Sequence, residues 1–172
     1  NIEKYLPAQA YADDGFKTIC TNPCGEIPLS AYDSCRLISV NLKSFVDRKF
    51  QKNTEFNFSR FSKTVAMAMR LSDDLVELEI EKLDNIISCV NGRRTGLGTH
   101  GLADALACLN LAYDSKEAIS MIDKIYETLK IAAYTESVRL SEERGSFPVF
   151  NWEKEKDNEF IKLLPPELQL LI

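Results

Sequence analysis

Only two short runs of this chain are rich in strand-forming residues, and both lie within the first 50 residues. They cover residues 16–21 and 35–42, and a segment punctuated by proline and glycine separates them. Two strands alone make a sheet that is marginally stable in water. The sequence therefore predicts a piece of a larger structure that starts with a strand, a long loop and a second strand. The absence of an initiator methionine before Asn1 points the same way.

The rest of the chain has the pattern of amphipathic helices. Over residues 59–90, apolar residues recur about every 3.6 positions and charged residues occupy the opposite face. A glycine-rich run at 91–99 is expected to form a turn, and a short helix carrying apolar residues from Leu102 to Leu109 follows it.

A third helix is predicted to begin at Asp114–Ser115, where Asp114 and Glu117 have the spacing of a capping box. Its apolar stripe extends to Leu140, and Gly145 stands where a residue after a helix end is expected. A charged helix at 153–164 would end before two consecutive prolines.

Composition narrows the class of protein. The 172 residues are 45% hydrophobic and 27% charged, which is typical of a globular chain and excludes wholesale disorder. The formal net charge is -5 and no dense basic block occurs, which argues against a nucleic-acid partner. Apolar runs are too short to span a membrane, and no secretion signal opens the chain. We expect one partial domain over 1–172, with strands and a loop in 1–50 and a helical part in 51–172.

Five cysteines occur, at positions 20, 24, 35, 89 and 108. An odd number of cysteines in a chain that can build a core does not fit a disulfide scaffold. No pair has C-x-x-C spacing and His100 is the single histidine, so no metal site is predicted. We expect free thiols in a reducing cytoplasm. Cys89 and Cys108 lie in apolar helical patterns and are expected to be buried.

Reactive side chains are concentrated between the two strand-like runs. Asn22, Cys24 and Glu26 alternate there, and Pro23 biases the preceding residue toward extended backbone. In extended chain, alternate residues face one side, so an amide, a thiol and a carboxylate are expected in line. A nucleophilic cysteine needs a base, usually histidine, and a nearby carboxylate disfavours the thiolate form. The set therefore suits radical chemistry of a neutral S–H group better than nucleophilic catalysis.

These residues resemble the active-site finger loop of the ribonucleotide reductase large (catalytic) subunit. The resemblance is carried by collinear blocks over most of the chain, namely Asn22–Glu26, Ser34–Leu37, Val40–Leu42, Arg93–Gly98, Gly101–Asp104 and Glu143–Pro148. The residues around the cysteine, Pro23 and Gly25, are most similar to the adenosylcobalamin-dependent class II enzymes. The resemblance implies an α/β fold, in which this chain is a mainly helical part, with a few strands, of a ten-stranded α/β barrel.

The resemblance also implies a role for each site residue. Cys24 would become a thiyl radical that abstracts the ribose 3′ hydrogen, and Glu26 would accept the proton of the 3′-hydroxyl. Asn22 would hydrogen-bond the substrate. Cys35 would be one of two thiols that supply two electrons and end as a disulfide, which a thioredoxin- or glutaredoxin-type dithiol reduces again. No role follows for Cys20, which is expected to be structural.

The expected partners are a ribonucleotide substrate and the rest of the reductase, either in one polypeptide or as a complementing chain. The second redox cysteine, the effector loops and the phosphate loop of the family are expected outside this segment, so the isolated chain would be inactive. An alternative is a catalytically incomplete helical module that works only by assembling with a partner chain. The sequence leaves open whether the protein is a homo-oligomer.

The glycine-rich run contains two further signals. Gly96 to Gly101 formally matches a dinucleotide-binding pattern, but that pattern requires a strand before it, and a helical pattern precedes it here. Arg93 and Arg94 are expected to pair with acidic residues of the long helix, such as Asp73, Asp74 or Glu77. His100 is expected to have a structural hydrogen-bonding role.

Overall fold

The computed structural model describes residues 10–25, 27–80 and 91–172, which form two compact units. Unit 1 contains the described residues of Asn1–Arg36, Leu71–Gly96 and Val138–Ile172. Unit 2 contains Leu37–Arg70 and Leu97–Ser137. Helix α2 (Phe58–Ile80) and helix α5 (Lys116–Arg144) contribute residues to both units.

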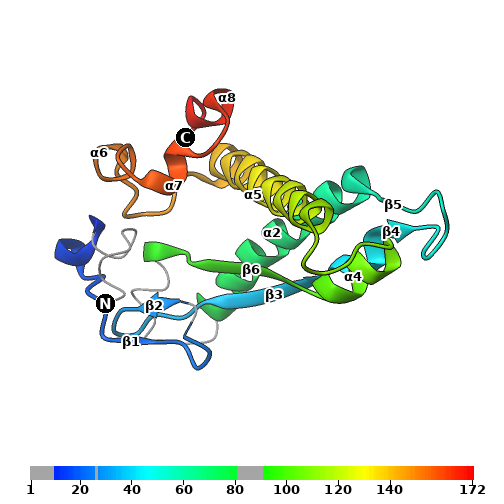
Figure 1. The fold of residues 1–172 in the computed structure, drawn as a ribbon. Coiled ribbons are helices and arrows are strands. Elements are labelled where there is room, and N and C mark those ends of the chain that lie inside the picture. Colours follow the sequence, from blue (N-terminus) through cyan, green and yellow to red (C-terminus); the bar gives the residue numbers. More distant parts are fainter. Residues whose placement is uncertain (1–9, 26, 81–90) are drawn as a thin grey trace. The chain divides into compact units, whose positions relative to one another are not determined.

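Unit 1 contains a small hairpin and several short helices. Strands β1 (Cys20–Thr21) and β2 (Pro28–Leu29) pair antiparallel, with Cys20 opposite Leu29 and Thr21 opposite Pro28 (Figure 1). A short 3-10 helix, η2 (Ala12–Asp14), precedes the hairpin. Three one-turn helices follow α5, namely α6 (Trp152–Glu155), α7 (Glu159–Lys162) and α8 (Pro166–Gln169).

Aromatic residues from distant parts of the sequence pack together in unit 1. The ring of Tyr11 contacts two other rings edge-on, with its centroid 6.5 Å from that of Phe16 and 6.2 Å from that of Phe147. Phe147 in turn contacts Phe150. Tyr11 and Phe16 are both buried. Edge-to-face contacts of this kind are favoured by the ring quadrupoles. They tie the segment before the hairpin to the segment after α5.

Unit 2 contains two further strand pairs. Strands β3 (Arg36–Asn41) and β6 (Thr95–His100) form one two-stranded sheet, in which each strand has its first residues in unit 1. Strands β4 (Val46–Asp47) and β5 (Glu55–Phe56) form the other. The 3-10 helix η3 (Leu42–Phe45) follows β3, and helix α4 (Leu102–Cys108) follows β6.

One hydrophobic core holds unit 2 together. Its fully buried side chains come from η3, β4, α2, α4 and α5, and they include Leu42, Phe61, Ala105 and Ile125. Phe45 and Phe61 lie 5.1 Å apart between ring centroids in an edge-on arrangement. Within unit 2, the apolar stripes that predicted the helices are therefore the faces that form this core.

Several sequence predictions need correction. The glycine-rich run was expected to be a turn, but residues 95–100 form strand β6, because they pair with β3. The third helix is capped by Ser115, whose Oγ accepts the amide of Ala118 at 3.1 Å, and not by Asp114. The single helix predicted at 153–164 is two separate turns, α6 and α7.

Other predictions are confirmed. The strand predicted at 35–42 is β3. The strand predicted at 16–21 is confirmed only at its last two residues, β1, and is wrong over 16–19, which form no strand. The predicted short helix is α4, and α5 ends at Arg144, directly before Gly145. The long helix is present as α2, and the part of its pattern at 81–90, with Cys89, lies outside the described residues.

The described part of the chain is mainly helical with a few strands, as predicted, and its strands form three separate pairs and no closed barrel. Among the helices that the structure describes, none combines the length and the apolar character that crossing a membrane requires.

Candidate active site

The finger-loop hairpin, residues 20–29, has its tip closed by Asn22. The amide of Asn22 donates to the carbonyl of Ile27 at 3.1 Å, and the Ile27 amide donates back to the Asn22 side-chain oxygen at 3.0 Å. Gly25 donates to the Asn22 carbonyl at 3.0 Å and has a φ of 77°, a conformation that a residue with a Cβ adopts at a cost. The expected extended segment is therefore wrong, because Asn22 bonds the backbone of its own loop and folds it into a turn.

Among the predicted site residues that the structure describes, Asn22 is the most buried. Its exposed fraction is 9%, and its Nδ2 has no hydrogen-bond partner among the described residues. Buried donors are rarely left unpaired, because each one loses its bonds to water. The Nδ2 group of Asn22 is thus available to a hydrogen-bond acceptor that is not part of the described chain.

The predicted catalytic residues fall into two places. Cys24 is exposed in the turn that Asn22 closes, and Glu26 lies outside the described residues. Cys35 is partly buried in the segment that leads into β3, and its Sγ lies 3.9 Å from the carbonyl oxygen of Arg36. The structure therefore brings Asn22 and Cys24 together in one turn and holds Cys35 in the segment that follows the hairpin.

The remaining described cysteines and the histidine have simpler surroundings. Cys108 is buried, as predicted, and Cys20 is exposed in β1. His100 has its Nδ1 2.9 Å from the hydroxyl of Ser39, which fits the expected structural role. Among residues 10–25, 27–80 and 91–172, no three His, Cys, Asp or Glu side chains are grouped so as to hold a metal ion.

The segment after the hairpin is held by Arg94, a contact that the sequence did not predict. The Nε of Arg94 lies 2.8 Å from the Oδ2 of Asp33, whose side chain is fully buried, and its Nη1 donates to the carbonyl of Pro28 at 3.0 Å. Arg94 was expected to pair with the long helix, and that expectation is wrong. The signal that could have found the contact is an aspartate in the loop, Asp33, that has no basic neighbour within the loop sequence.

The residues on both sides of Cys35 are bound to helix α2. Ser34 Oγ donates to Glu79 Oε2 at 3.1 Å, and the buried Arg36 forms an ion pair with the same carboxylate. Arg36 Nη1 also lies 3.5 Å from the carbonyl oxygen of Arg94. The backbone that carries Cys35 is therefore fixed at both neighbouring residues.

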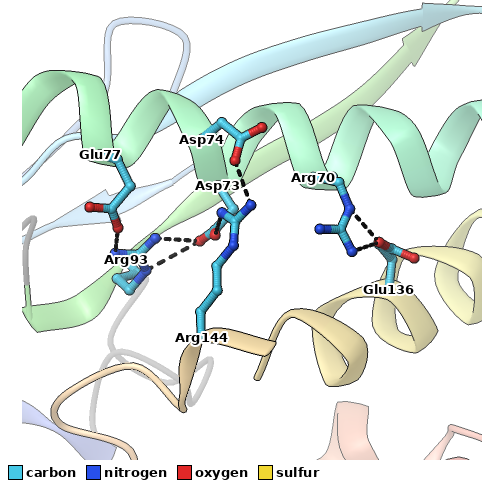
Figure 2. Close-up of polar contacts among 7 residues, drawn as sticks. All are labelled: Arg70, Asp73, Asp74, Glu77, Arg93, Glu136 and Arg144. Carbon is cyan, nitrogen blue, oxygen red and sulfur yellow. Dashed lines mark hydrogen bonds and ion pairs between the residues drawn. The ribbon is translucent and has the colours of Figure 1, made fainter. Parts of the chain in front are cut away.

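A cluster of ion pairs in unit 1 includes Arg93, which precedes Arg94 in the sequence (Figure 2). Arg93 donates to Asp73 at 2.8 Å and also pairs with Glu77, as predicted for this arginine. Arg144 reaches Asp73 at 2.7 Å and Asp74 at 2.8 Å from the end of α5. Burial lowers the pKa of Arg93, but its bonds to Asp73 and Glu77 more than offset this and raise the pKa overall. One carboxylate, that of Asp73, thus joins two arginines.

A separate ion pair lies within unit 2. Arg70 Nη2 lies 2.7 Å from Glu136 Oε1, and the Glu136 side chain is 7% exposed (Figure 2). The pair joins α2 to α5 within that unit.

Comparison with known proteins identifies the family. The profile of the family described as "Ribonucleotide reductase, barrel domain" matches residues 11–165. A vitamin B12-dependent ribonucleoside-diphosphate reductase of Mycobacterium tuberculosis is 37% identical over 131 residues, which are 76% of this chain and 18% of that protein. A protein of the same name from Thermoplasma acidophilum is 37% identical over 142 residues, with 78% and 18% covered.

A more distant relative has a different name. The ribonucleoside-diphosphate reductase large subunit of Variola virus is 30% identical over 132 residues, which are 76% of this chain and 17% of that protein. The chain therefore spans less than a fifth of the length of these relatives. Because the family profile covers nearly all of the sequence, the chain belongs to the ribonucleotide reductase barrel domain family.

Proposed function

We propose that this chain is the part of a ribonucleotide reductase catalytic subunit that carries the radical cysteine, in an enzyme that converts ribonucleotides to deoxyribonucleotides. The observation that carries the proposal is the geometry of the hairpin turn. The same turn carries the exposed thiol of Cys24 and the buried Nδ2 of Asn22, which has no partner among the described residues. A thiol and a hydrogen-bond donor in one turn are what a sugar substrate needs, one group to react and one to hold it.

The proposed reaction uses the site residues in sequence. The Cys24 thiyl radical takes the 3′ hydrogen atom, so that an S–H bond forms as the C3′–H bond breaks. Glu26 accepts the proton of the 3′-hydroxyl, and the 2′-hydroxyl leaves as water with a proton from one of the two redox thiols, Cys35 and a second cysteine. The other thiol gives its hydrogen atom to C2′. As the two sulfurs join in a disulfide, the remaining electron passes to the 3′ carbon and Glu26 returns its proton to the 3′ oxygen. A thioredoxin- or glutaredoxin-type dithiol reduces the disulfide. The hydrogen atom then returns from Cys24 to C3′, which restores the radical for the next turnover.

We propose adenosylcobalamin as the cofactor. Two relatives at 37% identity are named vitamin B12-dependent, which supports this cofactor. When bound, the cofactor would supply the radical that Cys24 Sγ holds. The residues of this chain would bind the substrate and provide the reacting thiol of Cys24 and the reducing thiol of Cys35. No described residue is assigned to binding of the cofactor.

A pair of cysteine variants tests the function. In the catalytic subunit assembled with this chain, Cys24→Ser should abolish deoxyribonucleotide formation and leave nucleotide binding intact. Cys20→Ser is the matched control, because Cys20 is also exposed and lies on the same hairpin. It should retain turnover. Normal product formation by Cys24→Ser would overturn the proposal.

The alternative, a catalytically incomplete module that works only by assembling with a partner chain, is tested separately. The chain spans 18% of the length of each of two relatives. We expect the chain alone, given adenosylcobalamin, ribonucleotide and a dithiol, to form no product. Mixing it with the remaining parts of the subunit should restore activity. Turnover by the chain alone would contradict this expectation.

A further inference from the structure

We propose that Arg94 is a positioning residue, which fixes the finger-loop hairpin and Cys35 in the arrangement that the radical reaction needs. This role rests on the function proposed above. Arg94 would act through the backbone and the buried carboxylate that it binds, and it would not touch the substrate itself.

The side chain of Arg94 binds Pro28 and Asp33, which are the two ends of the connection between the hairpin and the segment of Cys35. Pro28, whose carbonyl accepts from Nη1 at 3.0 Å, lies in β2 opposite Thr21 of the hairpin. Asp33, whose Oδ2 is 2.8 Å from Nε, lies two residues before Cys35. The chain between Pro28 and Asp33 leads from the hairpin of Cys24 to the segment of Cys35. One planar guanidinium therefore sets the span of that connection.

The partners of Arg94 are themselves held firmly. The Asp33 carboxylate, fully buried, also accepts from the Ser30 hydroxyl at 3.2 Å and from the Ser34 amide at 3.0 Å. The guanidinium of Arg94 lies over the ring of Phe16, 5.7 Å from its centroid, and that ring is 4% exposed. Charge-assisted bonds between such preorganised groups are strong and have a defined geometry. Movement of Arg94 would therefore disturb several buried bonds at once.

Arg94 is also linked to helix α2 through Arg36. Its carbonyl accepts from Arg36, and Arg36 pairs with Glu79 of α2. Its neighbour Arg93 binds Asp73 and Glu77 of the same helix. Through Arg36, Arg94 thus connects α2 with the hairpin connection, which is the placement expected of a support for a reactive loop.

The test compares two conservative variants of adjacent residues. Arg94→Lys keeps the charge, but a single ammonium group does not reproduce the fork that binds Pro28 and Asp33 together. Arg93→Lys is the matched control, because the Arg93 side chain binds α2 and not the connection. In the assembled catalytic subunit, Arg94→Lys should lower kcat roughly 10- to 100-fold, as small misplacements of reacting groups do, with little change in KM. Arg93→Lys should keep kcat per folded molecule.

Hydrogen exchange gives a readout that does not depend on turnover. The amides of Ile19, Asn22 and Ile27 form the hydrogen bonds of the hairpin. Their exchange should become about tenfold faster or more in Arg94→Lys, since the loss of a charged hydrogen bond has effects of that size, and should be unchanged in Arg93→Lys.

A double-variant comparison separates positioning from general destabilisation. Asp33→Asn weakens the same bond from the other side, so its effect on kcat should not add to that of Arg94→Lys. If Arg94→Lys does not fold, Asp33→Asn alone tests the bond by the same kcat and exchange measurements.

The role is wrong if Arg94→Lys lowers only the stability and leaves kcat per folded molecule and hairpin exchange unchanged, or if Arg93→Lys loses kcat equally. Failure of the proposed function has a different signature. Full turnover by Cys24→Ser would overturn that function, whereas the exchange difference between the two arginine variants would still stand.

Discussion

The side-chain oxygen of Asn22 accepts the amide of Ile27 at 3.0 Å, while its Nδ2 is buried without a partner among the described residues. The two halves of one amide group thus have different tasks. The oxygen closes the turn that carries Cys24, and under the proposed function the nitrogen donates to the substrate.

Two substitutions at position 22 separate these tasks. Asn22→Asp keeps an oxygen for Ile27 but removes the Nδ2 donor, so the turn should persist while ribonucleotide binding weakens, with KM raised about tenfold or more for one lost hydrogen bond. Asn22→Ala removes both groups and should also speed amide exchange at Ile27. The measurements are KM and hydrogen exchange on each variant. Unchanged KM in Asn22→Asp would show that Nδ2 does not meet the substrate.

Asp73 should contribute more to stability than its neighbour Asp74. The Asp73 side chain is 13% exposed and binds two arginines, whereas that of Asp74 is 48% exposed and binds one. Asp73→Asn leaves Arg93 and Arg144 short of a charged partner and should cost about 2 kcal/mol, between the values for exposed and buried pairs. Asp74→Asn should cost about 0.5 kcal/mol or less. Urea unfolding of the full chain measures both, and equal losses would contradict the ranking.

Two glycines that flank His100 should respond to alanine in opposite ways. Gly101 has a φ of 72°, and a Cβ there would meet the Asn41 side-chain oxygen at 2.7 Å. Asn41 uses that oxygen to cap η3 through the Lys43 amide, so Gly101→Ala should cost about 2 kcal/mol or more. A Cβ on Gly98 would meet nothing within 4 Å, so Gly98→Ala should stabilise by about 0.5 kcal/mol. Thermal unfolding of the two variants gives the comparison, and losses of the same size would refute it.

The stability of the fold should fall in alkaline solution because of Tyr11. Burial raises the pKa of Tyr11 from 10.0 to about 12. Below pH 10 the ring is neutral in both states and the full stability is present. Between pH 10 and about 12 the unfolded chain ionises more readily than the folded one, so about 2–3 kcal/mol is lost. Tyr11→Phe should remove this dependence in urea unfolding measured across that range. Parallel loss of stability in the variant would show that other groups are responsible.

Regular spacing made some elements predictable. The apolar stripes of α2, α4 and α5 form the faces that pack in the core, so their periodicity was sufficient. Strand β6 was missed because its glycines carry no alternating pattern, and its structure depends on pairing with β3, which is distant in sequence. The site residues are predicted from a motif. The turn that carries them was not predicted, because the bond from Asn22 to its own loop competes with extended backbone and leaves no periodic signal.

The contacts of the two arginines illustrate the same limit. Both were expected to bind α2, and Arg93 does. Arg94 pairs instead with Asp33, whose carboxylate is fully buried. Which carboxylate is buried depends on the whole fold. Sequence spacing along a helix could predict the first pairing and not the second.

The exposure of Cys24 has a consequence for the lifetime of a radical. A sulfur-centred radical in contact with solvent would be quenched by dioxygen or by any dissolved thiol before a substrate arrived. In the chain alone, Cys24 stands in the open at the tip of a hairpin with two residues in each strand. Under the proposed function, the remainder of the catalytic subunit therefore serves as a shield, and the radical should be generated only after that shield has closed around the loop.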